Sequence, residues 1–169
     1  MLLYFTGSGA VWGQIKPLLD VPYVQSSSNI VNSMIKLANV TKGDIVYDLG
    51  CGDGRIIVAA AKQFGAVGTG FDIDPKRIAE ANANAKSAGV ADKATFVVAD
   101  LFDVDLTKAT VVTIYLLPTV NLQLRPKLLA LRPGTRIVSH AFGMGDWKPE
   151  RMEEVDGSTI YLWIVPKRE

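Results

Sequence analysis

The chain has 169 residues, of which 49% are hydrophobic and 21% are charged. This length suits one domain with a substantial core, and the composition excludes an intrinsically disordered chain. Its 18 basic and 17 acidic residues give a net charge of +1, so charge alone predicts no nucleic-acid partner. The single cysteine, Cys51, excludes an internal disulfide, and we interpret it as a small filler because a catalytic thiol needs a histidine partner.

The first twelve residues are apolar, but they lack a basic flank and are too short to span a bilayer. We interpret residues 1–25 as a strap packed on the domain. The remnant of a membrane segment and an interfacial patch are the alternatives, so we expect a cytoplasmic protein with membrane association left open. Residues 26–169 are expected to form a single domain, because no repeat, low-complexity run or linker interrupts them. Serines at 26–28 precede an apolar-periodic stretch over about 30–38, which predicts a capped amphipathic helix.

Apolar runs then alternate with helical periodicity. Strands are predicted near 44–48, 67–71, 94–99, 110–116 and 135–141, with helices near 54–64, 75–88 and 119–131. Residues 150–155 and 158–165 flank Asp156-Gly157, a strong signal for a hairpin at the sheet edge. The pattern predicts a Rossmann-like, doubly wound α/β fold: a mostly parallel seven-stranded sheet with an antiparallel hairpin at the C-terminal end.

The most informative segment is 47–55, YDLGCGDGR, where an apolar strand ends in Asp48 and a glycine turn opens a helix. A dinucleotide fingerprint needs its third glycine at the position occupied by Arg55, and Asp48 lies where a pyrophosphate would approach. S-adenosylmethionine (SAM) has no phosphate. Its ammonium suits an acidic strand end, and its carboxylate suits the helix N-terminus. The loop therefore predicts a SAM site, with Arg55 meeting the SAM carboxylate or, more simply, pairing with a neighbouring acid.

Two further acids end the next two strands. Asp72 follows the first acid by about 20 residues, the spacing of a ribose-binding carboxylate, so we expect it to accept the ribose hydroxyls. Asp74-Pro75 predicts a helix N-cap followed by proline at the first helical position. An Asp-x-Asp pair also suits a divalent metal, but no third ligand has suitable spacing, and no metal site is predicted. Asp100, with Leu101 beside it, is placed to contact adenine, the alternative being a turn cap.

Five short segments in this order resemble a known family: VPYV at 21–24, YDLGCGDGR at 47–55, LLPTVN at 116–121, LRPKL at 124–128 and VSH at 138–140. With the acids and the terminal hairpin, the chain resembles the class I SAM-dependent methyltransferases. More narrowly, it is similar to the small archaeal protein-lysine methyltransferases and to related mitochondrial enzymes that modify inner-membrane proteins. The resemblance implies methyl transfer from SAM to a lysine amine of a protein substrate, with S-adenosyl-L-homocysteine as the product.

The resemblance also implies roles for single residues. At the cofactor, Tyr23 is expected to close over the methionine end of SAM, which Asp48, Gly50 and Gly52 hold. Asp72 and Ile73 are expected at the ribose, and Asp100 and Leu101 at the adenine. Two departures from the family stand out. Gln25-Ser26-Ser27 replaces its usual Pro-Thr-Pro, although Ser26 can still cap the helix, and Ala141 replaces an acid common after the Ser-His pair of archaeal members.

Methylating an amine requires its neutral form, and lysine has an ordinary pKa of about 10.4. An apolar slot beside a sulfonium favours the neutral amine, and aromatic faces hold cations. The aromatic candidates are Tyr23, Tyr115, Phe142 and Trp147, of which Trp147 is either a substrate-facing lip or an edge plug.

Three residues are predicted to be catalytic. Tyr115 ends the fourth strand, where such sheets bind ligands, and a core aromatic is its alternative. Asn121 is expected to orient the amine, or else to make a local backbone bond. His140 is expected to relay a proton, or else to be a hydrogen-bonded structural histidine.

Other functions remain open alternatives. A small-molecule methyltransferase needs a lid or inserted subdomain, which this chain lacks, and a SAM-binding protein without catalysis would keep the same acids. A nucleic-acid methyltransferase is disfavoured, because YLLP at 115–118 stands where an Asn-Pro-Pro-Tyr motif would grip a flipped base.

Overall fold

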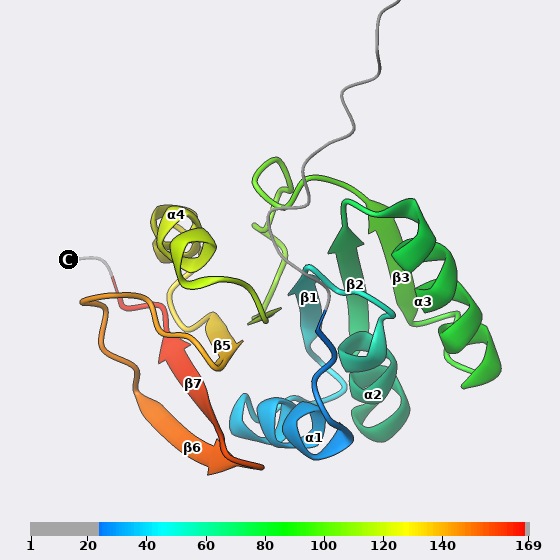
Figure 1. The fold of residues 1–169 in the computed structure, drawn as a ribbon, viewed down its shortest axis with the longest axis horizontal. Helices are drawn as coiled ribbons and strands as arrows, with labels where there is room; N and C mark the ends of the chain where they lie inside the picture. Colours follow the sequence, from blue (N-terminus) through cyan, green and yellow to red (C-terminus); the bar gives the residue numbers. More distant parts are fainter. Residues whose placement is uncertain (1–23, 168–169) are drawn as a thin grey trace, which may run out of the picture.

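The computed structural model describes residues 24–167, in which a seven-stranded sheet carries helices on both faces (Figure 1). The strands are β1 (Ile45–Leu49), β2 (Val67–Asp72), β3 (Ala94–Val98), β4 (Val111–Ile114), β5 (Arg136–His140), β6 (Arg151–Val155) and β7 (Ser158–Ile164). The helices are α1 (Ser28–Leu37), α2 (Arg55–Phe64), α3 (Pro75–Ser87) and α4 (Pro118–Leu129). The predicted fold class is confirmed.

The strand order is β3-β2-β1-β4-β5-β7-β6. Strands β1 to β5 are parallel, β7 pairs antiparallel with β5, and β6 pairs antiparallel with β7. Chain order reverses between β1 and β4, and ligands of open α/β sheets bind outside the carboxyl ends of the strands at this point. The topology therefore brings the ends of β1, β2 and β4 to one site.

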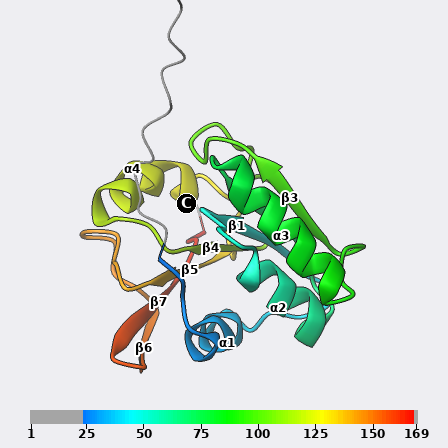
Figure 2. The same cartoon turned by 45° about the vertical axis from the view of Figure 1, so that its right-hand side comes forward.

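Each face of the sheet has its own core, because successive residues of a strand point to opposite faces. In β4, Val111 packs with the residues of α1, α2 and α3, whereas Val112 and Ile114 pack with those of α4. Figures 1 and 2 show the same division, with α1, α2 and α3 on one side of the sheet and α4 on the other.

The fourth strand is shorter than predicted. It ends at Ile114, and residues 115–117 leave the sheet because Pro118 begins α4. The hairpin turn is confirmed: Asp156 and Gly157 have φ of 50° and 74°, the left-handed pair of a type I′ turn.

The cap of α1 differs from the expectation. Ser27, not Ser26, is the N-cap, and its side chain accepts from the backbone N–H of Ile30. Within residues 24–167 no helix is long and apolar enough to cross a membrane. The division into 1–25 and 26–169 stays a prediction, since most of the first segment lies outside the described residues.

Candidate active site

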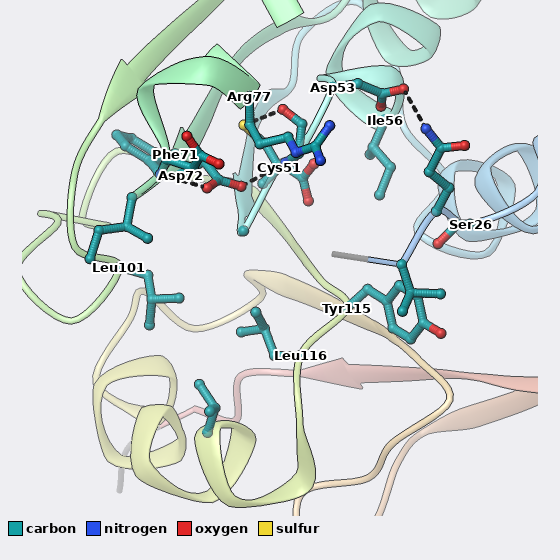
Figure 3. A pocket seen from close by; sticks show the side chains of 18 of the residues that line it. Ser26, Cys51, Asp53, Ile56, Phe71, Asp72, Arg77, Leu101, Tyr115 and Leu116 are labelled. Atoms are coloured by element: carbon teal, nitrogen blue, oxygen red, sulfur yellow. Dashed lines mark hydrogen bonds between the residues drawn. The ribbon is translucent and has the colours of Figure 1, made fainter. Parts of the chain in front are cut away.

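A cavity of about 320 Å³ lies at the carboxyl ends of the strands, near the lower end of the roughly 300–1,000 Å³ range of small-molecule sites. In Figure 3, Phe71, Asp72 and Leu101 lie toward one end of it and Ser26 and Tyr115 toward the other. Its charged lining residues are the carboxylates Asp48, Asp53, Asp72, Asp74 and Asp100 and the guanidinium groups Arg55 and Arg77. Five acids against two bases favour a cationic ligand.

The glycine loop between β1 and α2 is held against β2. The backbone N–H groups of Gly50 and Cys51 both donate to the carbonyl of Phe71, at 2.8 and 2.9 Å. Gly54 has φ of 76°, and a Cβ there would lie 2.5 Å from the ring of Phe96. A residue with a side chain would strain this backbone and displace the ring, so glycine lets the loop fold tightly over the sheet.

Asp48 is the most perturbed acid of the site. Its carboxyl group is almost fully buried, and Thr113 on neighbouring β4 donates a 2.7 Å hydrogen bond to it. Burial raises the pKa of Asp48 to about 7, and the nearby charges of Asp72 and Asp53 raise it further against the lowering effect of the Thr113 bond. A cationic ligand would reverse this balance, so Asp48 suits the ammonium of SAM.

Asp72 organises the loops around it. One carboxylate oxygen accepts the N–H of Gly52 and the other accepts the N–H of Asp74, both at 2.9 Å. Asp74 in turn caps α3 by accepting the N–H of Lys76, which confirms the predicted N-cap. Each oxygen of Asp72 keeps acceptor capacity for a ribose hydroxyl.

Arg55 pairs with Asp53, the simpler of the two partners that the sequence predicted. Its Nε and one terminal nitrogen reach the two oxygens of Asp53 at 2.9 and 2.6 Å. Its other terminal nitrogen donates to the carbonyl of Ser26 at 2.7 Å. The guanidinium therefore fixes the segment 24–27, three of whose residues line the cavity.

His140 lies behind Tyr115 and does not itself line the cavity. Its Nδ1 is 2.9 Å from the hydroxyl of Ser26 and its Nε2 is 2.9 Å from that of Ser158. The ring of Tyr115, which lines the cavity, lies over it with centroids 3.9 Å apart. Burial lowers the pKa of His140, so the imidazole is neutral at pH 7.

Asn121 is fully buried and also lies outside the lining. Its amide nitrogen donates to the hydroxyl of Ser139 and to the carbonyls of Phe142 and Gly143, at 3.2 to 3.3 Å. Phe142 does line the cavity. Trp147 does not, and instead packs on Trp163, whose indole N–H donates to its carbonyl.

The cavity brings together most of the predicted site residues, namely Asp48, Gly50, Gly52, Asp72, Ile73, Asp100, Leu101 and Tyr115. Tyr23 lies outside the described residues. The sequence-based prediction missed Thr113, although a threonine in the otherwise apolar strand Val111–Ile114 was an available signal. It also missed Ser158, for which no motif gave a signal. Residues 24–167 hold no cluster of three potential metal ligands.

Comparisons with known proteins identify the relatives of this chain. A family profile described as the ANTKMT methyltransferase domain matches residues 48–151. The chain is 47% identical over 151 residues to a protein-lysine N-methyltransferase of Saccharolobus islandicus, covering 86% of this chain and 94% of that protein. It is 35% identical over 132 residues to the adenine nucleotide translocase lysine N-methyltransferase of Mus musculus, covering 78% of this chain but only 57% of the mouse protein.

A solved structure is similarly close. The crystal structure of an RNA methyltransferase from Salinibacter ruber, in complex with S-adenosyl-L-homocysteine, superposes with a TM-score of 0.84 at 49% identity and covers 86% of this chain and 96% of that one. The profile match spans more than half of the chain, and the Saccharolobus relative is matched almost from end to end. The chain therefore belongs to the ANTKMT methyltransferase domain family and is a class I SAM-dependent methyltransferase.

Proposed function

We propose that the protein transfers a methyl group from SAM to the side-chain amine of lysine in protein substrates. The observation that carries the proposal is the apolar and aromatic part of the cavity lining, which includes Tyr115, Leu117, Val120 and Phe142, next to five carboxylates. The carboxylates suit the positive charges of SAM and disfavour a phosphate backbone, and an apolar wall beside a sulfonium favours a neutral amine. The protein-lysine N-methyltransferase of Saccharolobus islandicus supports the same class of substrate.

The cofactor roles proposed for the lining residues follow the order of the strands. Asp48 faces the ammonium of the methionine end, with Gly50 and Gly52 beside it. Asp72 and Ile73 hold the ribose at the end of β2. Asp100 and Leu101 hold the adenine after β3, where Asp100 also accepts the N–H of Phe102. SAM supplies an activated methyl group on a positively charged sulfur.

The acceptor end differs in character from the cofactor end. We assign to it Tyr115, Leu117, Val120 and Phe142, which line the cavity and follow β4 or β5, and whose side chains are apolar or aromatic. An ammonium that enters this region is disfavoured by low polarity and by the positive sulfur, so lysine loses its proton to water before reaction. Its lone pair then attacks the methyl carbon in line with the bond to sulfur; the new N–C bond forms as the C–S bond breaks. This step requires alignment of the amine with the methyl group and exclusion of water, and it requires no nucleophile from the protein.

The test uses purified protein, radiolabelled SAM and a cell extract. After reaction, one sample is treated with ribonuclease, one with protease, and a third is hydrolysed and searched for methylated lysine by mass spectrometry. Label that is protease-sensitive and recovered as methyl-lysine supports the proposal. Ribonuclease-sensitive label would place the chain with the activity named for the Salinibacter ruber protein, and label confined to small molecules would indicate a small-molecule enzyme.

A titration with SAM alone completes the test. SAM binding without label in any fraction would indicate a non-catalytic SAM-binding protein. Cytoplasmic location, and membrane association through residues 1–25, stay predictions.

A further inference from the structure

We propose that Asn121 is a positioning residue for methyl transfer, which acts by holding a strained turn that presents Phe142 to the acceptor end of the cavity. The proposal concerns the transfer step, and it rests on the proposed function only for the acceptor used in its test.

The turn follows β5 directly. The N–H of Ala141 makes the last sheet bond, to the carbonyl of Thr159 at 2.8 Å. The N–H of Phe142 then turns back to the carbonyl of His140 at 2.9 Å, two residues earlier, and Ala141 between them has φ of 67°. A three-residue turn with a left-handed central residue is a rare and strained form of the γ-turn. Such strain persists only where surrounding contacts over-determine the backbone.

Asn121 supplies those contacts from α4. Its amide nitrogen reaches the carbonyls of Phe142 and Gly143, and Ser139 adds a 2.6 Å bond from its hydroxyl to the carbonyl of Phe142. The carbonyl oxygen of the Asn121 side chain has no hydrogen-bond partner among the described residues. Reversing the amide would place that oxygen against two carbonyl oxygens, so the donors must face the turn. A fully buried amide with an unpaired oxygen is destabilising, and an apolar side chain would avoid the penalty. The donors to the turn are therefore the physical reason for an amide here.

The turn matters because of where Phe142 lies. Phe142 and Tyr115 follow adjacent strands and both line the cavity. An aromatic face next to a sulfonium and an amine attracts their positive charge, but only at a suitable distance and angle. Transfer rates are steeply sensitive to alignment. A turn that relaxes would move this aromatic wall without touching the cofactor side of the cavity.

The experiment compares three variants with the wild type. Asn121→Leu removes the donors at similar side-chain size, and Ser139→Ala removes only the hydroxyl and is the milder change. Thr110→Val is the matched control, since it removes a partly buried hydroxyl that donates to Asp44 and accepts the N–H of Ile45, near the opposite end of the strands. Each is tested for SAM affinity by titration, for methyl transfer to poly-L-lysine in single-turnover reactions, and for amide hydrogen exchange of residues 139–144.

We expect Asn121→Leu to slow transfer by about 10- to 100-fold while SAM affinity changes less than about threefold. Exchange in 139–144 should rise, Ser139→Ala should act in the same direction but less, and Thr110→Val should change neither quantity. Wild-type transfer or unchanged exchange in Asn121→Leu would overturn the proposal. So would an equal loss in Thr110→Val, which would indicate general destabilisation.

A double-mutant cycle tests the route through Phe142. If Asn121 acts by holding Phe142, then Phe142→Leu should cost little further in the Asn121→Leu background, whereas independent roles would multiply the two losses. A wild type that leaves poly-L-lysine unmodified but labels RNA or a small molecule would contradict the proposed function alone. In that case the transfer rates of the variants relative to the wild type are measured with the RNA or small molecule that was labelled. Failure of the proposed function can then be told apart from failure of the role proposed for Asn121.

Discussion

The hydroxyl of Ser26 and the Nδ1 atom of His140 lie 2.9 Å apart, although 114 positions separate these residues in the chain. Nε2 of the same ring meets Ser158 at the start of β7, and Tyr115 lies over its face. Both ring nitrogens are thus occupied by hydroxyl groups. The ring joins the segment before α1, the end of β4 and the hairpin, which suits a holding role better than proton transfer.

Replacing His140 by Phe keeps an aromatic ring under Tyr115 and removes both hydrogen bonds. We expect the free energy of unfolding to fall by about 1–3 kcal/mol and SAM affinity to fall several-fold, because Ser26 lines the cavity. Denaturant titration and calorimetric SAM titration measure these effects. Full SAM affinity with loss of an acidic limb in the pH–rate profile would instead establish His140 as a proton relay.

The same variant has a signature in pH. Because burial lowers the pKa of His140 below its usual 6.5, the unfolded chain takes up this proton at a higher pH than the folded one. The wild type therefore loses stability as pH falls from about 6.5 toward the folded pKa. In His140→Phe this acid loss should be smaller. Identical slopes of unfolding free energy against pH in the two proteins would contradict the assignment.

The ionised carboxylate of Asp48 should lower the stability of the ligand-free protein and be required for SAM binding. Its pKa of about 7 lies above the value of 3.8 for a free Asp, so the wild type without ligand loses stability as pH rises through that window, by at most about 1.4 kcal/mol per unit. Asp48→Asn should raise the unfolding temperature at pH 8 and abolish SAM binding. In the wild type, SAM affinity should weaken by up to about tenfold per unit below pH 7. A stabilised variant that still binds SAM would refute the role of Asp48.

Asp72→Ala should abolish measurable SAM binding. Its effect on stability should be larger than a rim carboxylate suggests, about 1–3 kcal/mol, because two backbone N–H groups lose their acceptor. Asp105→Ala is the matched control, since Asp105 accepts one N–H from Thr107 in an exposed turn away from the cavity. The measurements are SAM titration and thermal unfolding of both variants. Unchanged SAM affinity in Asp72→Ala would contradict the assignment of this cavity as the SAM site.

Two glycines with nearly the same φ allow the cost of backbone strain to be distinguished from the cost of a steric clash. Gly54 and Gly89 have φ of 76° and 71°, but an added Cβ meets the Phe96 ring only at Gly54 and nothing within 4 Å at Gly89. Gly89→Ala should destabilise by about 1–2 kcal/mol from backbone strain, and Gly54→Ala by about 1–3 kcal/mol more from overpacking. Urea unfolding of both variants measures the difference. Equal losses would mean that the glycine loop tolerates a side chain.

The fold was largely readable from the sequence, because its signals are local. Alternation of apolar strands and periodic helices predicted the parallel sheet, and Asp156-Gly157 predicted a turn that needs two left-handed residues. The Asp74-Pro75 cap and the pairing of Arg55 with Asp53 also came from neighbouring positions.

The contacts that hold the acceptor end of the cavity could not be predicted from the sequence. Asn121 and His140 drew attention as polar residues near strand ends, but their partners lie 18 to 114 positions away and depend on how α4 and β7 pack. Thr113 meets Asp48 only because β4 lies beside β1 in this register. Long-range polar contacts of this kind leave no periodic pattern, and one sequence cannot supply them.

The hairpin carries a consequence for the timing of synthesis. Ser27 donates to Asp156 in the hairpin turn, and Ser26 is linked through His140 to Ser158, so the hairpin, together with Arg55, holds the segment before α1. Chains leave the ribosome from the N-terminus onward. The glycine loop therefore emerges about a hundred residues before the hairpin that contacts Ser27 and His140. We expect a chain clipped before β7 to bind SAM more weakly than the intact chain, because His140 would lose its contact with Ser158.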